Sequence, residues 1–140
     1  MSRVINTNVA GKERTRLSKS IVLAIRELMQ QTEVTSLSRD LVAFLVLALS
    51  QIAEGVETSV AAWEKRDYWL KADRFRMEWE WSRTLSEQLY AALMADDWAH
   101  IAGLVAQVGQ RVGNVQVSPR HRLGKPWIGA WRALQQRENP

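Results

Sequence analysis

Hydrophobic residues recur at intervals of three and four positions almost without a break between Leu17 and Val112. This spacing places them on one face of an α-helix, whereas a half-buried strand would alternate at every second position. No pair of alternating segments joined by turn residues competes with the helical pattern. The sequence therefore predicts an all-α fold.

Four helices account for the periodic part of the chain. The second contains LVAFLVLALSQIA, which is apolar almost all round and must therefore be buried on several sides. Short connections between successive helices favour an antiparallel up-and-down four-helix bundle with a short C-terminal extension. The expected helices cover about residues 16–31, 38–65, 68–95 and 97–112.

Residues that begin or end helices lie at several of these boundaries. Thr15 or Ser18 is expected to cap the first helix, and Ser38 with Asp40 in the first turn marks the start of the second. The turn after the second helix is expected near positions 66 and 67. It is the weakest boundary, because no Gly or Pro accompanies it.

Charge divides the chain into basic ends and an acidic middle. Residues 1–19 carry five Lys/Arg and one acid, residues 111–140 carry six and one, and the stretch between them carries eight and thirteen. Basic ends around an acidic body are typical of a protein that meets a polyanion or an acidic partner with its ends. Solubilising tails are the open alternative. The predicted parts are a basic N-terminal arm over 1–15, the bundle over 16–115 and a basic, Trp-containing extension over 116–140.

The cations of the two ends are candidate nucleic-acid-binding residues, because Lys and Arg neutralise phosphates. In the extension, Trp127 and Trp131 lie on one face of a short expected helix together with Ile128 and Leu134. These two tryptophans are candidates for binding a partner, with folding back onto the chain's own bundle equally open. The candidate phosphate contacts are Lys12, Arg14, Arg16, Arg120, Arg122, Lys125 and Arg132.

Four of the seven tryptophans lie between positions 63 and 81, among both cations and acids. Aromatic and basic residues together can bind single-stranded nucleic acid. The acids of this stretch favour ion pairs as the simpler interpretation. Trp79 and Trp81 are separated by about 200° on a helix, so they are expected to face different surfaces.

The sequence does not indicate a catalytic or metal site. The absence of cysteine excludes disulfides, thiolate metal ligands and a cysteine nucleophile. Asp97 and His100 have half of the spacing used by di-iron bundles, with Glu54 and Glu57 as further carboxylates, but the second such pair is missing. No serine triad or phosphate-binding loop is recognisable. We therefore expect a protein without enzymatic activity, cofactor or metal.

A membrane is not among the expected partners. The longest uninterrupted apolar run, Leu41 to Leu49, has nine residues, whereas a membrane-spanning helix needs about 20. The first residues contain no apolar run of the length found in secretory signals. The expected location is the cytoplasm.

Three segments of the predicted bundle follow the pattern of a known family. They read SRDLVAFLVLALSQIAEGV, YWLKADRFRMEWEWSRTL and IAGLVAQVGQRVGNV, and they cover about residues 38 to 115. Together they resemble the core helices of the accessory variability determinant proteins of diversity-generating retroelements. The helical-bundle proteins of ribosomal-RNA intervening sequences are similar as well.

The resemblance implies a ring-shaped homopentamer that binds a reverse transcriptase and nucleic acid and has no catalytic residues of its own. It also implies that Arg111, at the end of the last matching helix, contacts nucleic acid. The acidic middle and the Trp-rich extension depart from the family pattern.

The leading hypothesis is a non-enzymatic, nucleic-acid-binding accessory subunit that associates with a reverse transcriptase. Two alternatives stay open. One is a small helical subunit of a CRISPR effector complex. The other is a structural or interaction protein that binds no nucleic acid and works through its acidic helices. Salt separates this last alternative from the others, because phosphate binding weakens steeply as salt rises.

Overall fold

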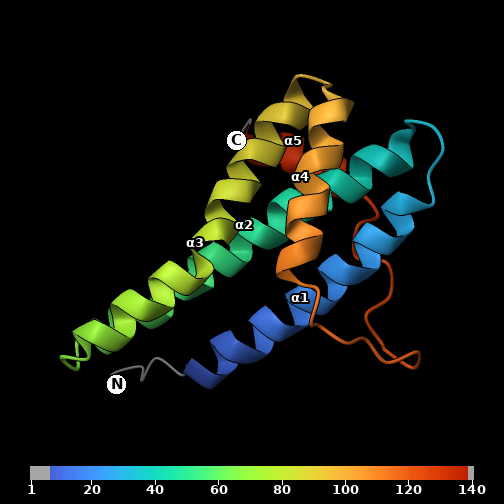
Figure 1. Ribbon diagram of the computed structural model, residues 1–140. Helices are drawn as coiled ribbons and strands as arrows, with labels where there is room; N and C mark the ends of the chain where they lie inside the picture. Colours follow the sequence, from blue (N-terminus) through green and yellow to red (C-terminus); the bar gives the residue numbers. More distant parts are fainter. Residues whose placement is uncertain (1–6, 139–140) are drawn as a thin grey trace.

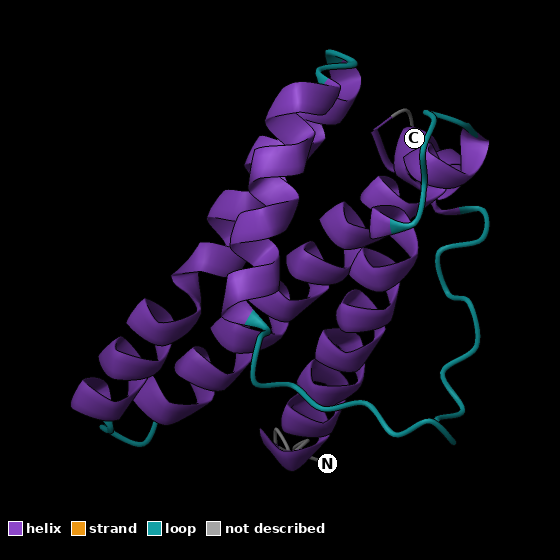
Figure 2. Ribbon diagram, turned by 45° about the vertical axis from the view of Figure 1, so that its right-hand side comes forward, coloured by secondary structure: helices purple, strands orange, loops and turns teal. Residues whose placement is uncertain are grey.

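The computed structural model describes residues 7–138, and in this part of the chain it contains helices and no strand (Figures 1 and 2). The prediction of an all-α fold is confirmed. The helices are α1 (Thr7–Met29), α2 (Ser36–Glu64), α3 (Trp69–Met94), α4 (Trp98–Arg111) and α5 (Ala130–Glu138).

Helix α2 is the centre of the molecule and contacts α1, α3 and α5. Its run from Leu41 to Val46 is buried at every position, as the apolar sequence predicts. By length and composition α2 also meets the criterion for a membrane-spanning helix, and 61% of its most apolar window is buried inside the molecule. Core helices of folded domains have the same composition, and here the neighbouring helices cover α2.

Helix α4 is the shortest of the first four helices, and it does not cover the turn between α2 and α3. It has 14 residues, whereas α2 has 29 and α3 has 26. It packs against α3 and more lightly against α1. In Figure 1, α4 ends well before the turn that joins α2 to α3, so this turn projects from the body.

The first helix begins at Thr7, about nine residues before the predicted start near 16. The expected capping roles of Thr15 and Ser18 are wrong, because both residues lie inside the helix. The Thr15 hydroxyl donates to the carbonyl of Gly11 at 3.0 Å, and the Ser18 hydroxyl donates to that of Arg14 at 2.8 Å. Hydroxyl side chains that cap helices also make such bonds one turn back within a helix.

The second helix also starts earlier than predicted, at Ser36 with Thr35 as its N-cap. The Ser38 hydroxyl accepts a hydrogen bond from the backbone N–H of Thr35 at 3.0 Å and donates to the carbonyl of Glu33. Ser38 therefore lies in the first turn of α2 and binds the N-cap residue through its hydroxyl. This corrects its expected role as the cap.

The turn after α2 lies where it was predicted. It contains no Gly or Pro, and Asp67 supplies the left-handed backbone conformation with φ 62°. Aspartate visits this region more readily than most residues. Asp97 caps the start of α4, because its carboxylate accepts from the backbone N–H of His100 at 3.2 Å.

The C-terminal extension folds back onto α2, one of the two alternatives that the sequence left open. Leu134 is fully buried and Trp127 is 5% exposed. The Asp40 carboxylate accepts hydrogen bonds from the backbone N–H groups of Gly129 at 3.2 Å and Trp131 at 3.0 Å. A side chain of α2 thus caps α5, and the extension shares the core of the helical body.

Candidate nucleic-acid interface

The segment from Trp98 to Arg137 contains six Lys/Arg and no Asp or Glu. This segment forms α4, the long loop after it and most of α5. Five of the six cations are candidate phosphate contacts, and all five are exposed: Arg111, Arg120, Arg122, Lys125 and Arg132. Long-range attraction to a polyanion depends on such cations being exposed without neighbouring carboxylates.

Four of these cations stand on the outer surface of the extension. Arg120, Arg122 and Lys125 lie in the loop, and Arg132 lies in the first turns of α5. None of the four makes an ion pair with a carboxylate in the described part of the chain. Their charges are therefore available to an external anion.

On α1, the expected contacts have different surroundings. Lys12 is exposed, whereas Arg16 pairs with Glu13 one turn earlier on the helix. The hydrogen bond from Arg16 lowers the pKa of the Glu13 carboxyl, and the same bond raises the pKa of Arg16. This pair neutralises part of the charge expected of the N-terminal arm.

Arg14 packs against aromatic rings of α3. Its guanidinium lies 4.8 Å from the ring centre of Phe75 and 5.3 Å from that of Trp79. Burial lowers the pKa of Arg14, and the charge of Glu78 opposes this shift. The Nη1 atom of Arg14 is buried and has no hydrogen-bond partner among the described residues. Arg14 is thus a half-buried cation, placed differently from the exposed residues of the loop.

Four rings form an aromatic cluster that joins the ends of α2 and α3: Trp63, Phe75, Trp79 and Trp81. Trp63 meets Phe75 edge to face at 5.0 Å, and Phe75 lies 6.5 Å from Trp79. The Arg111 guanidinium lies 5.7 Å from the ring centre of Trp81. The structure therefore brings two candidate cations, one from α1 and one from α4, to a single aromatic cluster.

The expectation that Trp79 and Trp81 face separate surfaces is wrong. Their rings stack at 5.8 Å with 28° between the planes, and both are half-buried. The two positions flank the buried stripe of α3, and the small, fully buried Ser82 lies between them on that stripe. The two long indole side chains reach each other from either side of this stripe.

A polar groove lies beside Arg111, between α3 and α4. Its volume is about 460 Å³, and its lining includes Trp81, Gln88, Gln107, Gln110 and Arg111. Amide side chains both donate and accept hydrogen bonds, and a guanidinium binds phosphate oxygens. The lining also contains Glu80, so one carboxylate stands against one guanidinium. Such a lining suits a polar ligand better than an apolar one.

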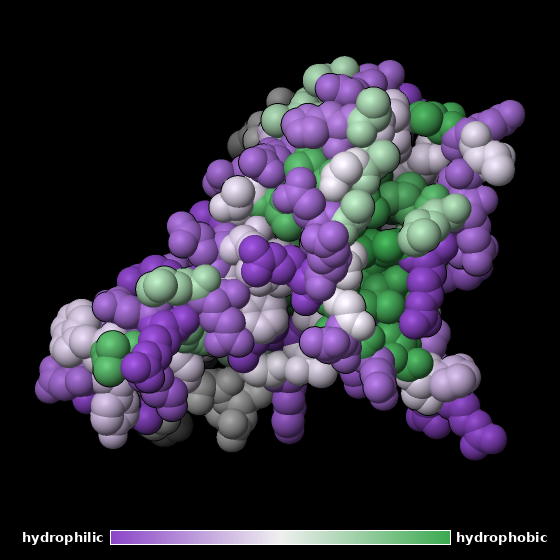
Figure 3. Space-filling view, in the orientation of Figure 1, coloured by the Kyte–Doolittle hydropathy of each residue, from purple (hydrophilic) through white to green (hydrophobic). Residues whose placement is uncertain are grey.

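A second groove, between the end of α1 and α4, is apolar. It measures about 290 Å³, and its lining includes Leu28, Val34, Trp98, Ile101 and Val105. Figure 3 shows hydrophobic surface along the boundary between α4 and α1. Its lining contains one charged residue, Glu33, so it adds nothing to phosphate binding.

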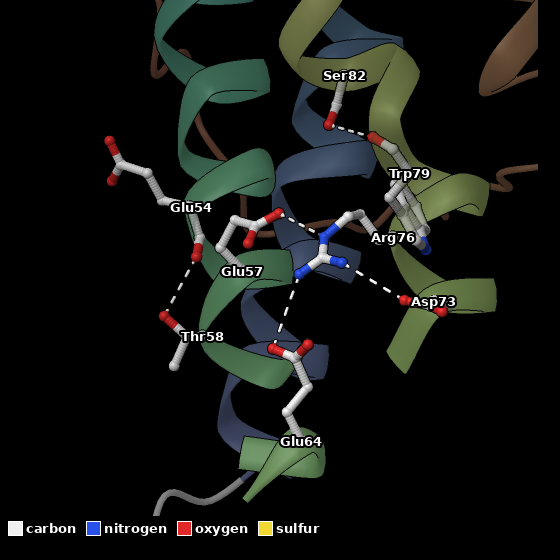
Figure 4. Close-up of polar contacts among 8 residues, drawn as sticks. All are labelled: Glu54, Glu57, Thr58, Glu64, Asp73, Arg76, Trp79 and Ser82. Atoms are coloured by element: carbon white, nitrogen blue, oxygen red, sulfur yellow. Dashed lines mark hydrogen bonds and ion pairs between the residues drawn. The ribbon is translucent and has the colours of Figure 1, made fainter. Parts of the chain in front are cut away.

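Ion pairs account for part of the charge between positions 63 and 83, as the sequence suggested. The Arg76 guanidinium contacts three carboxylates: Glu57 at 3.4 Å, Glu64 at 3.7 Å and Asp73 at 3.5 Å. Figure 4 shows these contacts converging on Arg76 from α2 and α3. A single arginine thus forms ion pairs with three carboxylates of this region.

Trp127 and Trp131, the candidate partner-binding residues, face the chain's own core. Trp127 is buried and Trp131 is half-buried against it. The apolar face, for which a partner and the chain's own bundle were equally open, covers α2. A partner role for this pair stays a prediction, and this arrangement does not favour it.

Asp97 and His100, whose spacing alone did not predict a metal site, lie at the start of α4. Asp97 caps α4, and no group of three or more His, Asp or Glu side chains suited to a metal occurs in the described part of the chain. The sequence reasoning missed Asp40 as the cap of α5, because nothing near Asp40 in the sequence points to a segment about ninety positions away.

Comparison of the chain with protein-family models, with curated proteins and with solved structures gives no match in any of the three. The family resemblance of the three core segments therefore stays a prediction.

Proposed function

We propose that this protein is a non-enzymatic subunit that binds single-stranded RNA or DNA through the cations of its C-terminal segment. The observation that carries the proposal is the exposed, acid-free run of cations from Arg111 to Arg132. Phosphate binding releases condensed counterions and needs no shaped pocket, so exposed Lys and Arg on a loop suffice for it.

The polar groove beside Arg111 gives the proposal a second contact. Trp81 and the amides of Gln107 and Gln110 stand next to a cation there. Amides can meet base edges while the guanidinium meets a phosphate. Arg14 contributes less in this proposal, because its guanidinium lies against Phe75 and Trp79.

The test is binding of a labelled single-stranded RNA, measured by fluorescence anisotropy over a series of salt concentrations. The variant replaces Arg120, Arg122, Lys125 and Arg132 with Gln. We expect weaker binding, and a slope of log affinity against log salt that falls by about 0.7 for each phosphate that the protein no longer neutralises. A single-stranded DNA of the same sequence shows whether the 2′-hydroxyl matters.

A matched control removes the same charge elsewhere. It replaces Lys65, Arg66, Arg74 and Arg83 with Gln, all of them exposed on α3 or the turn before it. We expect this control to keep the slope of the parent. Absence of binding by the parent at low salt would refute the proposal, as would an equal loss of slope in the two variants.

We further propose that α1 to α4 form an antiparallel up-and-down four-helix bundle. The short connections between these helices and the contacts of α1 with α2, α2 with α3 and α3 with α4 support it. Association with a reverse transcriptase in the cytoplasm and assembly as a homopentamer rest on the family resemblance. Light scattering of the purified protein tests the assembly, and copurification with a tagged reverse transcriptase encoded nearby tests the partner.

A further inference from the structure

The turn between α2 and α3 carries an unusual concentration of exposed apolar side chains. Tyr68 and Trp69 are each 55% exposed, and Leu70 is 65% exposed. The three are consecutive at the start of α3, so they point in different directions around the helix end. They form an apolar tip at the end of the molecule that α4 does not reach (Figure 1).

Cations surround this apolar tip, and two of the nearby acids form ion pairs. Arg76 forms ion pairs with Glu64 and Asp73. Lys65, Arg66 and Arg74 are exposed and make no ion pair in the described part of the chain. The Lys71 ammonium lies over the ring of Trp63 at 4.6 Å. From position 65 to 72, Asp67 is the one acid.

We propose that the apolar tip binds the surface of a bilayer that contains anionic lipids. Tyr and Trp prefer the interface between headgroups and acyl chains. Aliphatic side chains such as Leu70 enter the acyl boundary, while Lys and Arg beside them meet the anionic headgroups. The tip combines these three kinds of side chain at one projecting end of the protein.

The contact is peripheral, so it differs from both a membrane-spanning helix and the sequence-based expectation of no membrane partner. Helix α2 stays in the core, and only the turn and the start of α3 enter the interface. An open cavity of about 590 Å³ lies beside the tip. Its lining combines the apolar side chains of Trp63, Trp69, Leu70 and Phe75 with two cations and two acids, Lys71, Arg74, Asp67 and Glu78.

Single-stranded nucleic acid is the competing occupant, because Tyr68 and Trp69 can stack on bases. The exposed aliphatic side chain of Leu70 favours the bilayer, since it has no aromatic face for stacking. The choice between the two occupants is an outcome of the test below.

The test measures cosedimentation of the full chain with two kinds of vesicle: phosphatidylcholine alone, and phosphatidylcholine mixed with phosphatidylserine. We expect binding to the anionic vesicles that weakens with salt, and little binding to the neutral ones. Replacing Lys65, Arg66 and Arg74 with Gln should lower partitioning by about a hundredfold. The matched charge control replaces Arg120, Arg122 and Lys125 with Gln and should lower it far less.

A second pair of variants tests the apolar part. Trp69→Ser with Leu70→Ser should abolish most of the binding, because the apolar side chains that enter the bilayer are gone. Met29→Ser with Ile128→Ser removes two side chains that are also exposed, 78% and 71%, but lie away from the tip. This control should bind as the parent does. Far-UV circular dichroism of each variant shows that it remains helical.

Equal sedimentation of the Trp69/Leu70 variant and its control would overturn the proposal, as would equal binding to neutral and anionic vesicles. If the tip variants lose RNA binding and keep vesicle binding, the tip is a stacking site and the lipid proposal falls. The proposal of RNA binding by the extension and the proposal of bilayer binding by the tip can be refuted independently. The phosphate contacts of the extension and the residues of the tip are changed in different variants.

Discussion

At the scale of single residues, Arg14 is a cation that packs half-buried against aromatic rings. Its guanidinium lies over Phe75 and Trp79, and its Nη1 atom is buried with no acceptor in residues 7–138. Guanidinium groups stack well on aromatic rings, and the alkyl part of the side chain adds packing. The same atoms carry a desolvation cost, which lowers the pKa of Arg14. Its contribution to stability therefore comes mainly from packing.

Two substitutions separate packing from charge at this position. Arg14→Met keeps a long side chain against the rings and removes the desolvated charge, so the free energy of unfolding should change by less than about 1 kcal/mol. Arg14→Ala removes the packing as well and should cost about 1 to 2 kcal/mol. Urea unfolding followed by circular dichroism measures both. Equal losses in the two variants would show that the charge matters more than the packing.

The Glu13–Arg16 pair is predicted to change the pKa of the Glu13 carboxyl measurably. Because the hydrogen bond from Arg16 lowers the pKa of the Glu13 carboxyl, Arg16→Gln should raise that pKa toward its ordinary value. Carbon-detected NMR of the glutamate carboxyls measures the shift. Because the pKa of Glu13 is lower in the folded protein, the pair stabilises the fold at pH values above the ordinary pKa of 4.5. This stabilisation is lost as the pH falls through the lowered pKa. The pair is exposed, so the effect on unfolding should be small.

At the scale of helices and turns, apolar periodicity predicted the elements, and polar contacts set their ends. The start of α1 was missed because residues 7 to 15 are mostly polar and have no apolar stripe to reveal a helix. The turn at Asp67 was placed correctly because the apolar line is interrupted there. The stacking of Trp79 on Trp81 could not be read from helix angles, since side-chain length and the small Ser82 decide it.

The attachment of α5 depends on one side chain of α2. The Asp40 carboxylate accepts from two backbone N–H groups at the start of α5, where the helix dipole also favours a negative charge. Asp40→Ala leaves both N–H groups without this acceptor and should lower the free energy of unfolding by about 1 to 2 kcal/mol. Asp40→Asn keeps one acceptor oxygen and should cost less.

Amide hydrogen exchange locates the effect of the Asp40 substitution. Protection in α5 should fall before protection in α1 or α3 does. Glu87→Ala is the control, because Glu87 is an exposed acid of α3 far along the sequence from the α5 junction. A variant at Asp40 that leaves exchange in α5 unchanged would show that apolar packing alone holds this helix.

At the scale of the whole molecule, the extension combines two roles that the sequence suggested separately. Its apolar side chains Trp127 and Leu134 complete the core over α2, while its cations face outward. Charge and hydrophobic pattern predicted both properties, but nothing in the pattern showed which surface the apolar face would cover. That choice depends on the shape of α2 and on Asp40, both of which exist only in the folded chain.

A chain that ends at Val117 is therefore predicted to lose stability as well as cations. Leu134 is fully buried and Trp127 is 5% exposed, and burying such a side chain contributes about 1.5 to 3 kcal/mol. The truncated protein should unfold at a lower urea concentration and melt at a lower temperature than the parent.

The variant with four Gln at positions 120, 122, 125 and 132 should unfold like the parent, because these side chains are exposed. If the truncated chain is as stable as the parent, the extension does not pack on α2 in solution. Loss of RNA binding by the four-Gln variant at unchanged stability assigns the binding to charge.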